Sequence, residues 1–349
     1  DVLGSRGLGD VYKRQILTLL TALVPFGVNA QYKAVSAGGC HCMVLKTDGT
    51  AWGFGFNQYG QLGDGTTTQR YKPVMAMSNV KEVSAGDMHT LVLKNDGSVW
   101  AFGYNCSGQI GDGTTTNRAV PVKVLDGIRH IAAGFLSSMA IGSDGTLWAW
   151  GDNIEGKLGV SAAERQRLRP VRVMTGVVGV SSGEDHTLVL KNDGSVWAMG
   201  DNHSGQLGNG TYTPSARPVK VMEGAKAVSA GKWHSLALKT DGTLYGWGAN
   251  GNYQLSASGQ DSAVPMRLRG NVKVMDAGEM HTMVILNDGT LEGWGFNQDG
   301  QVGSGASFES KDPWITDRYV KSVSAGGSCT LYILENGDLM VTGVINPQE

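Results

Sequence analysis

Histidine and carboxylate side chains recur at regular intervals along this chain, and both residue types bind metals or transfer protons. Five histidines occupy one position of a repeating pattern, namely His41, His89, His186, His234 and His281. Each lies in a different copy of the pattern, whereas a compact metal site needs its nitrogen ligands about 2 Å from one ion. We therefore predict no metal site, and we expect each histidine to hydrogen-bond backbone within its own repeat.

Two loops with the sequence Gly-Asp-Gly-Thr-Thr-Thr, at residues 63–68 and 111–116, supply one carboxylate each. Calcium takes about six to eight oxygen ligands, so neither loop predicts a calcium site. The glycines form no phosphate-binding motif, and no catalytic Ser-His-Asp or Cys-His set stands apart from the repeats. A polar cluster at the centre of the fold cannot be identified from the sequence. We predict that the chain is not an enzyme and uses no cofactor.

The repeat has three anchors whose spacing is constant. The glycine of Ser-Ala-Gly precedes the aspartate of Asp-Gly-Thr by ten residues, and the glycine of Trp-x-x-Gly follows seven residues later. Repeat length varies between 47 and 49 residues only in the segment before the next proline. A constant unit joined by one variable loop is typical of a repeat architecture. The first-anchor glycines are Gly38, Gly86, Gly134, Gly183, Gly231, Gly278 and Gly326.

Each repeat predicts four short antiparallel strands. Apolar and polar residues alternate on both sides of an Asp-Gly pair, which is a strong hairpin signal because glycine accepts the positive φ of the turn. A proline thirteen residues before each later anchor glycine suits the first residue of an outer strand. Seven repeats of about 48 residues predict an all-β, seven-bladed β-propeller. The expected blades are residues 31–78, 79–126, 127–175, 176–223, 224–269, 270–316 and 317–349.

The first 30 residues lie outside the repeats. Residues 5–15 resemble the in-frame translation of a transposase-type sequencing adaptor, so we expect residues 1–15 to be an artefact of metagenomic origin. Residues 16–30 resemble the apolar core of a secretory signal peptide, which predicts export from a bacterial cell. Alternatively, Pro25 has the offset of the repeat prolines, and residues 23–28 would then be a strand that completes the seventh blade of a cytoplasmic protein.

Four cysteines do not form a framework of disulfides. Cys329 occupies the histidine position of the last repeat, and Cys40 and Cys42 lie in the first repeat, which a closed ring makes its neighbour. A Cys329–Cys40 or Cys329–Cys42 bond is therefore an alternative in an exported protein. We favour buried, reduced cysteines that pack as small apolar residues.

Two further repeat positions have structural interpretations. Aromatic residues four and six positions after the hairpin aspartate, such as Trp52 and Phe54, lie on one face of a strand and predict packing between blades. An asparagine two positions after the Trp-x-x-Gly glycine, such as Asn57, is expected to bond loop backbone.

The repeat Ser-Ala-Gly-x-x-His-[Ser/Thr]…Asp-Gly-[Ser/Thr]-x-Trp-x-x-Gly-x-Asn-x-x-Gly-Gln-Leu-Gly resembles the regulator of chromosome condensation repeat over residues 32–343. That resemblance implies a seven-bladed propeller. It also implies protein binding, because the eukaryotic namesake is a guanine nucleotide exchange factor that docks on chromatin and a bacterial relative inhibits a β-lactamase. The constant repeat length leaves no room for the wedge that works on the GTPase, so exchange activity is an alternative that we do not favour.

The two positions between the anchor glycine and the histidine differ in every repeat. Large apolar residues beside charged ones at these positions resemble the core and surround of a protein interface. All seven turns should open on one face of the propeller. We predict that this face binds a protein through Asp87, Met88, Phe135, Leu136, Glu184, Asp185, Lys232, Trp233, Glu279 and Met280.

The charge balance limits the other partners. The 349 residues carry a net charge of −2 and no Lys/Arg cluster, which argues against nucleic-acid binding. We expect the mature protein to be a monomer that does not associate with membranes. A glycan-binding propeller is the main alternative. It would present one aromatic platform per blade, whereas the free positions here differ from blade to blade.

Overall fold

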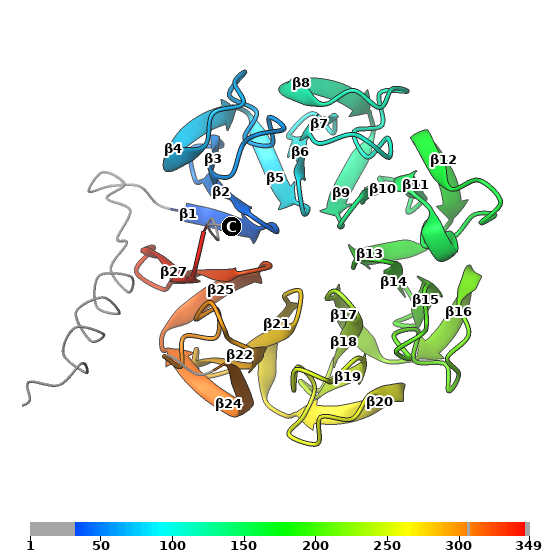
Figure 1. The fold of residues 1–349 in the computed structure, drawn as a ribbon, viewed down its shortest axis with the longest axis vertical. Coiled ribbons are helices and arrows are strands. Elements are labelled where there is room, and N and C mark those ends of the chain that lie inside the picture. The colour runs from blue at the N-terminus through cyan, green and yellow to red at the C-terminus, as the bar shows by residue number, and fades with distance from the viewer. Residues whose placement is uncertain (1–31, 306–307, 346–349) are drawn as a thin grey trace, which may run out of the picture.

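The computed structural model describes residues 32–305 and 308–345, which form seven β-sheets around a central axis (Figure 1). Within these residues, six sheets have four antiparallel strands and the seventh has three. The strands of each sheet follow chain order outward from the axis. The structure therefore confirms the predicted all-β, seven-bladed propeller. Residues 1–15 and 16–30, with the adaptor, signal-peptide and closing-strand interpretations, lie outside the described residues.

Four kinds of strand build the blades. The innermost strands are β1 (Tyr32–Ala37), β5 (Val80–Ala85), β9 (Ile128–Ala133), β13 (Val177–Ser182), β17 (Ala225–Ala230), β21 (Val272–Ala277) and β25 (Val320–Ala325). The second strands are β2 (His41–Lys46), β6 (His89–Lys94), β10 (Ser137–Gly142), β14 (His186–Lys191), β18 (His234–Lys239), β22 (His281–Leu286) and β26 (Cys329–Leu334).

The third strands are β3 (Ala51–Gly55), β7 (Val99–Gly103), β11 (Leu147–Asp152), β15 (Val196–Gly200), β19 (Leu244–Gly248), β23 (Leu291–Phe296) and β27 (Leu339–Gly343). The outer strands are β4 (Arg70–Met77), β8 (Arg118–Leu125), β12 (Gln166–Met174), β16 (Ser215–Met222), β20 (Ser262–Arg269) and β24 (Glu309–Asp317). In the described parts of the chain the one helical segment is the 3-10 turn η1 (Ile154–Gly156), and none is long and apolar enough to span a membrane.

The Asp-Gly hairpins form as predicted between the second and third strands. In the first blade, Gly49 has a φ of 80°, and Asp48 Oδ1 accepts hydrogen bonds from Thr50 N at 2.8 Å and from Thr50 Oγ1 at 2.6 Å. Glycine adopts this positive φ without the steric cost that a Cβ would add. The aspartate thus fixes the turn from one side while the glycine permits its backbone geometry.

The repeat prolines do not begin the outer strands, so that prediction is wrong. Pro73 is the fourth residue of β4, at a point where the pairing with β3 jumps from Gly53↔Val74 to Gly55↔Arg70. The same irregularity occurs in the other five outer strands. A bulge on an edge strand removes the need for a backbone donor, and proline has none.

The hydrophobic core is divided into seven clusters, each lying between two neighbouring blades. One cluster joins Met43 and Leu45 of the first blade to Val83 and Phe102 of the second. The aromatic residue six positions after the hairpin aspartate is buried in these clusters. One example is Trp150, whose indole N–H donates to Gln109 O of the preceding blade at 2.9 Å. The aromatic residue four positions after the aspartate is partly buried and packs at the edges of the same clusters. The predicted packing of aromatics between blades is confirmed.

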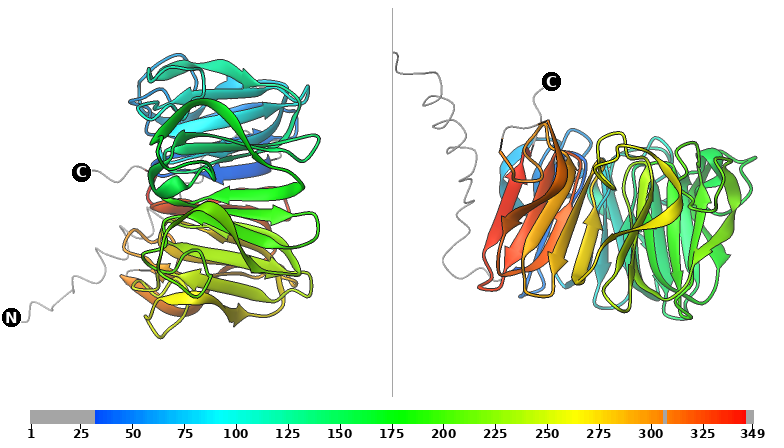
Figure 2. Two further views of the ribbon diagram at one scale, coloured as in Figure 1. Left: turned by 90° about the vertical axis from the view of Figure 1, so that its right-hand side faces the viewer. Right: turned by 90° about the horizontal axis from the view of Figure 1, so that it is seen from below.

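The last blade packs directly against the first, which closes the ring (Figure 2). Ala37 N of β1 donates to Ser324 Oγ of β25 at 3.0 Å, and Gly327 N donates to Gly38 O at 3.2 Å. Cys42 and Cys329 lie in the apolar cluster at this interface. The strand β1 therefore lies beside β25 and β26 of the last blade.

Candidate functional site

The seven Ser-Ala-Gly turns are held by three backbone hydrogen bonds each. In the second blade, Gly86 N donates to His89 O at 2.9 Å, and Tyr104 N donates to Met88 O at 2.9 Å. The third bond runs from Asp87 N to Gly134 O of the next blade at 3.3 Å. Three such bonds occur in all seven blades, although in the fourth and fifth the acceptor of the third bond is Lys232 O or Glu279 O rather than the anchor glycine, and the last bond closes on Gly38. Backbone hydrogen bonds within and between blades therefore fix the turns that carry the variable residues.

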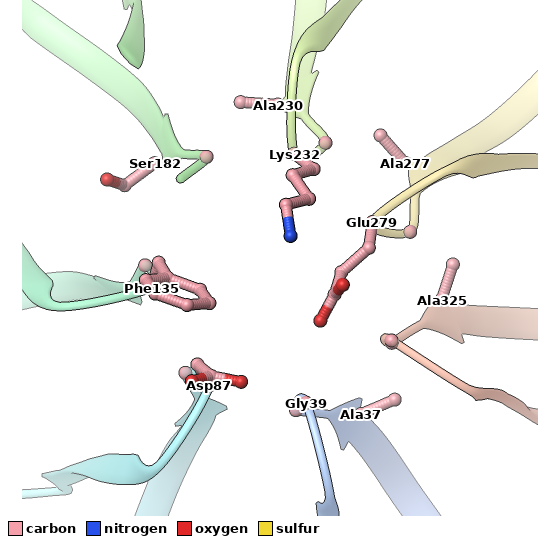
Figure 3. Close-up of a pocket in the computed structure, with 18 of the residues that line it drawn as sticks. Ala37, Gly39, Asp87, Phe135, Ser182, Ala230, Lys232, Ala277, Glu279 and Ala325 are labelled. Atoms are coloured by element: carbon pink, nitrogen blue, oxygen red, sulfur yellow. The ribbon is translucent and has the colours of Figure 1, made fainter. Parts of the chain in front are cut away.

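The two variable positions of each Ser-Ala-Gly turn have different surroundings. The first position of every blade lines a cavity of about 190 Å³ on the propeller axis (Figure 3). These seven residues are Gly39, Asp87, Phe135, Glu184, Lys232, Glu279 and Gly327. None of the second-position residues lines this cavity. The ten predicted interface residues thus form an inner, mainly charged set and an outer, mainly apolar set.

The inner set brings together three carboxylates, one ammonium group and one phenyl ring. Figure 3 shows the side chains of Asp87, Lys232 and Glu279 pointing toward the axis from different blades. Lys232 Nζ lies 3.6 Å from Glu184 Oε2, which makes an ion pair without a hydrogen bond, and 5.9 Å from the centre of the Phe135 ring. Of the described residues that line the cavity, only Lys232 is basic. We call these five residues the axial cluster.

Glycines at the first positions of blades one and seven give the carboxylates their space. A Cβ at Gly39 would clash with Asp87 Oδ1, and a Cβ at Gly327 would lie 2.6 Å from Glu279 Oε1. Asp87 and Glu279 therefore lean over the two glycine turns from either side. The sequence shows the glycines but not this relationship, because it depends on the curvature of the closed ring.

Burial raises the pKa values of the three carboxyl groups, and repulsion from other carboxylates adds to the rise in Asp87 and Glu184. Burial is the largest cause for Asp87, and the negative charge of Glu279 adds to it, so the pKa of Asp87 rises to about 7 despite the opposing effect of Lys232. Burial likewise raises the pKa of Glu279 and of Glu184. The axial cluster can consequently change its net charge near neutral pH.

Below the axial cluster, serine hydroxyls join the innermost strands. Ser36 Oγ accepts from Ala85 N of the next blade at 2.9 Å, and this bond recurs around most of the ring. In the sixth blade Asp276 replaces the serine, and its Oδ2 accepts from Ala325 N at 2.9 Å. Burial raises the pKa of Asp276 to about 6 although these hydrogen bonds oppose the rise. The carboxylate therefore continues the ring of bonds between blades.

The outer set surrounds the cavity mouth and is uneven around the ring. Met88, Leu136 and Met280 are half-buried, whereas Trp233 is 37% exposed. Lys232 Nζ lies 4.9 Å from the centre of the Trp233 ring. The partly exposed aromatic residue of the outer set is thus in contact with the lysine of the axial cluster.

Lys157 supports this surface and was not predicted. It is buried, and its Nζ lies 2.7 Å from Asp152 Oδ2 and 3.2 Å from Asp185 Oδ1 while donating to Glu184 O at 2.6 Å. Lys157 occupies the glutamine position of the Gly-Gln-Leu-Gly motif. That single departure from the repeat was the signal in the sequence. Lys157 therefore fixes the turn that carries two of the predicted interface residues.

The recurring histidines bond to the neighbouring blade, so the prediction of backbone bonds within their own repeat is wrong. His41 Nε2 lies 2.8 Å from Thr90 Oγ1, whose hydroxyl donates to Gln61 O at 2.8 Å. His89, His186, His234 and His281 contact a serine or threonine of the next blade in the same way. Burial lowers the pKa of all five, which therefore stay neutral at pH 7.

The loop residues have the structural roles that the sequence indicated. Asn57 Nδ2 donates to Thr66 O and Thr68 O, while its Oδ1 accepts from Leu62 N. Asp64 of the first Gly-Asp-Gly-Thr loop pairs with Arg70 at 2.7 Å. Among the described residues no group of three His, Cys, Asp or Glu side chains could hold a metal ion.

The axial cluster is a polar cluster at the ring centre, which could not be identified from the sequence. The side chains of the axial cluster supply charge and can exchange protons. With three carboxylates and one ammonium group, the cavity mouth favours positive charge when the acids are ionised. Phe135 adds an apolar wall. The arrangement suits recognition by contact and charge.

Comparison with protein families agrees with the fold. The model of the RCC1-like domain matches residues 75–347, and two models of the regulator of chromosome condensation (RCC1) repeat match residues 48–93 and 32–61. No curated protein matches the chain in a sequence search.

Three solved structures illustrate the likeness in fold. Human WBSCR16 is 21% identical with a TM-score of 0.78, over 91% of this chain and 87% of that one. Prp20p from Saccharomyces cerevisiae, described with its binding to Gsp1p and histones, is 21% identical with a TM-score of 0.76, over 91% and 83%. The CRINKLY WD40 ectodomain of the Arabidopsis thaliana receptor kinase ACR4 is 14% identical with a TM-score of 0.53, over 92% and 98%. Since the family model spans most of the chain and the blades match its repeats, this protein belongs to the RCC1-like propeller family.

Proposed function

We propose that the protein is a non-catalytic binding module that recognises a protein partner through the face carrying the Ser-Ala-Gly turns. The observation that carries this proposal is that the same hydrogen-bonded turns hold an inner charged set and an outer apolar set of side chains. Charged side chains of the axial cluster lie inside, and Met88, Leu136, Trp233 and Met280 lie outside. An apolar set that alternates with fixed charges is typical of a specific protein interface.

Rigidity supports a binding function for this face. Each variable residue is flanked by backbone hydrogen bonds within its blade and to the next one. Side chains that are already positioned lose less conformational freedom when a partner binds, which favours affinity. Trp233 combines partial exposure with this fixed backbone, and tryptophan is enriched among residues that dominate binding energy.

The asymmetry of the face favours a protein over a repeated glycan. Among the outer set and its equivalents at Cys40 and Ser328, Trp233 is the one aromatic residue. A sugar-binding propeller with equivalent sites would repeat its aromatic platform from blade to blade. Guanine nucleotide exchange is the other alternative, and the likeness to Prp20p concerns the fold alone at 21% identity. Export of the protein is a proposal that rests on the sequence of residues 16–30.

Cross-linking capture tests the proposal. The parent protein, a Phe135→Ala/Trp233→Ala variant and a Tyr71→Ala/Trp314→Ala control are incubated with the same extract. The control removes two exposed aromatics from outer strands, where Tyr71 is 78% and Trp314 49% exposed. A protein retained by the parent and the control but lost by the face variant supports the proposal. Equal capture by all three contradicts it, and a glycan array then tests the alternative.

A further inference from the structure

Two buried cysteines face each other at the interface where the ring closes. Cys42 lies on β2 of the first blade, Cys329 on β26 of the last, and their Sγ atoms are 3.8 Å apart. Both side chains are almost completely inaccessible to solvent. They are 287 residues apart in the chain, so a bond between them would enclose nearly the whole propeller.

The cysteines replace a pair of polar residues that other interfaces share. At five interfaces a histidine at the position of Cys329 contacts a hydroxyl at the position of Cys42, as His89 contacts Ser138 at 2.8 Å. All six equivalents of Cys42 are serine or threonine. At the closing interface both partners have changed, and both have changed to cysteine. Two buried cysteines with separate roles would not be expected at positions that contact each other.

We propose that Cys42 and Cys329 form a disulfide that covalently joins the first and last blades when the chain folds in the presence of a disulfide oxidant. The two thiols lose two protons and two electrons as the Sγ–Sγ bond forms, and the oxidant, a low-molecular-weight or protein disulfide, is reduced to two thiols. A disulfide bond is about 2.05 Å long, so the sulfur atoms must move about 1.75 Å closer.

The environment of the pair determines when the bond forms. The hydrogen bond with the Cys329 thiol, and then burial, raise the pKa of Cys42 well above its ordinary value, and the thiolate is the reactive species. Thiol–disulfide exchange with the oxidant is therefore slow in the closed, reduced propeller, whereas the two thiols are accessible while the chain folds. Once formed, the bond is enclosed in the apolar cluster of Tyr32, Val44 and Leu331 and is shielded from thiol reductants.

The closest competitor is Cys40, two residues from Cys42. It lies in the turn, is half-buried, and has a pKa raised to about 11, first by burial and then by Asp87. Cys106 is exposed on another blade and is a control for non-specific oxidation. The structure therefore assigns Cys42 rather than Cys40 as the partner of Cys329.

The test is oxidative refolding of the full chain from urea with a glutathione redox mixture. In parallel, native reduced protein is incubated for several days with the same mixture. Free thiols are alkylated, the chain is digested with trypsin, and cross-linked peptides are identified by mass spectrometry. Residues 34–46 contain both Cys40 and Cys42, so a Cys40→Ser variant identifies the bonded residue. The expected product joins residues 34–46 to 322–349 in the parent, Cys40→Ser and Cys106→Ser proteins.

Two further readouts keep the test decisive. Cys42→Ala and Cys329→Ala should lose the cross-linked peptide and the faster migration of the denatured, cyclised chain on a non-reducing gel. Cross-linking this long a segment should raise the melting temperature of the oxidised parent by roughly 5–10 °C relative to the reduced parent. Alkylation of both cysteines after refolding and after prolonged oxidation, or a bond from Cys329 to Cys40, would overturn the proposal.

Discussion

The ammonium group of Lys232 lies 3.6 Å from Glu184 Oε2 at the mouth of the axial cavity. This pair joins the fourth and fifth blades on the face that we propose as an interface. Lys232 also acts on more distant carboxyl groups, because it opposes the rise in the pKa of Asp87, Glu184 and Glu279. One lysine therefore favours the ionised form of all three carboxyl groups of the axial cluster.

A Lys232→Met variant should raise the pKa of Asp87 above its value of about 7. The reason is that the variant removes the positive charge that favours the ionised carboxylate. Carbon-detected NMR titration of the Asp87 carboxyl measures the change. A Lys220→Met variant, which removes an exposed lysine paired with Glu223, should leave the Asp87 titration unchanged. A fall in the Asp87 pKa in Lys232→Met would contradict the arrangement of the axial cluster.

The bonds between histidines and neighbouring hydroxyls should stabilise the ring. A Ser138→Ala variant leaves His89 Nε2 without its partner and removes the hydroxyl that donates to Gln109 O. We expect the free energy of unfolding to fall by about 1–3 kcal/mol, since a buried polar group loses its hydrogen bond. Urea denaturation measures the loss. Ser143→Ala, at an exposed turn of the same blade, should change stability by less than about 0.5 kcal/mol.

Lys157 should be strongly coupled to Asp152. Lys157→Gln restores the residue of the other repeats but leaves the buried Asp152 carboxylate without its cation, so we expect a loss of about 3–5 kcal/mol in the free energy of unfolding. The fifth blade has Ala249 and Gln254 at these two positions. An Asp152→Ala/Lys157→Gln double variant should therefore be more stable than Lys157→Gln alone. A double variant that is less stable than Lys157→Gln would rule out this coupling.

The buried histidines should make the protein sensitive to mild acid. Their pKa is lowered to about 4 in His41 and His186 and to about 3 in His89, His234 and His281. An unfolded histidine has a pKa of about 6.5, so the unfolded chain binds more protons below that pH. The stabilisation from neutral histidine is present above pH 6.5 and is lost as the pH falls through the folded pKa.

Two buried carboxyl groups act in the opposite direction. Because the pKa is raised to about 7 in Asp87 and about 6 in Asp276, their contribution is full below about pH 4 and is lost as the pH rises through those values. The five histidines outnumber them, and the raised pKa values of Glu184 and Glu279 do not reverse the balance. Urea unfolding should therefore give a lower free energy at pH 5.0 than at pH 6.5. His89→Gln should reduce that difference, whereas stability that increases toward pH 5.0 would refute the prediction.

The sequence predicted what depends on local patterns. Alternating polarity and the Asp-Gly pairs identified the hairpins, and the constant anchors fixed the number of blades. The bonds of Asn57 could be foreseen because they stay within one loop. These features repeat seven times, so each copy supports the interpretation of the others.

Contacts between repeats could not be predicted in the same way. The partner of His41 is Thr90, 49 residues later, and that choice depends on how two blades stack. The two variable positions separate into inner and outer sets because the turns curve around a closed ring. The sequence places Asp87 beside Met88 but cannot tell which of them faces the axis. Lys157 was visible as a departure from the repeat, although its three acceptors come from two blades.

If the proposed function is correct, a protein partner binds the face around Trp233. Site-specific photo-cross-linking can detect this contact, with benzoylphenylalanine placed at Trp233 in one variant and at Tyr71, on the outer strand β4, in another. We expect a partner that becomes covalently attached on illumination from position 233 and not from position 71. Attachment from position 71 alone would place the interface on the rim of the propeller and contradict the claim.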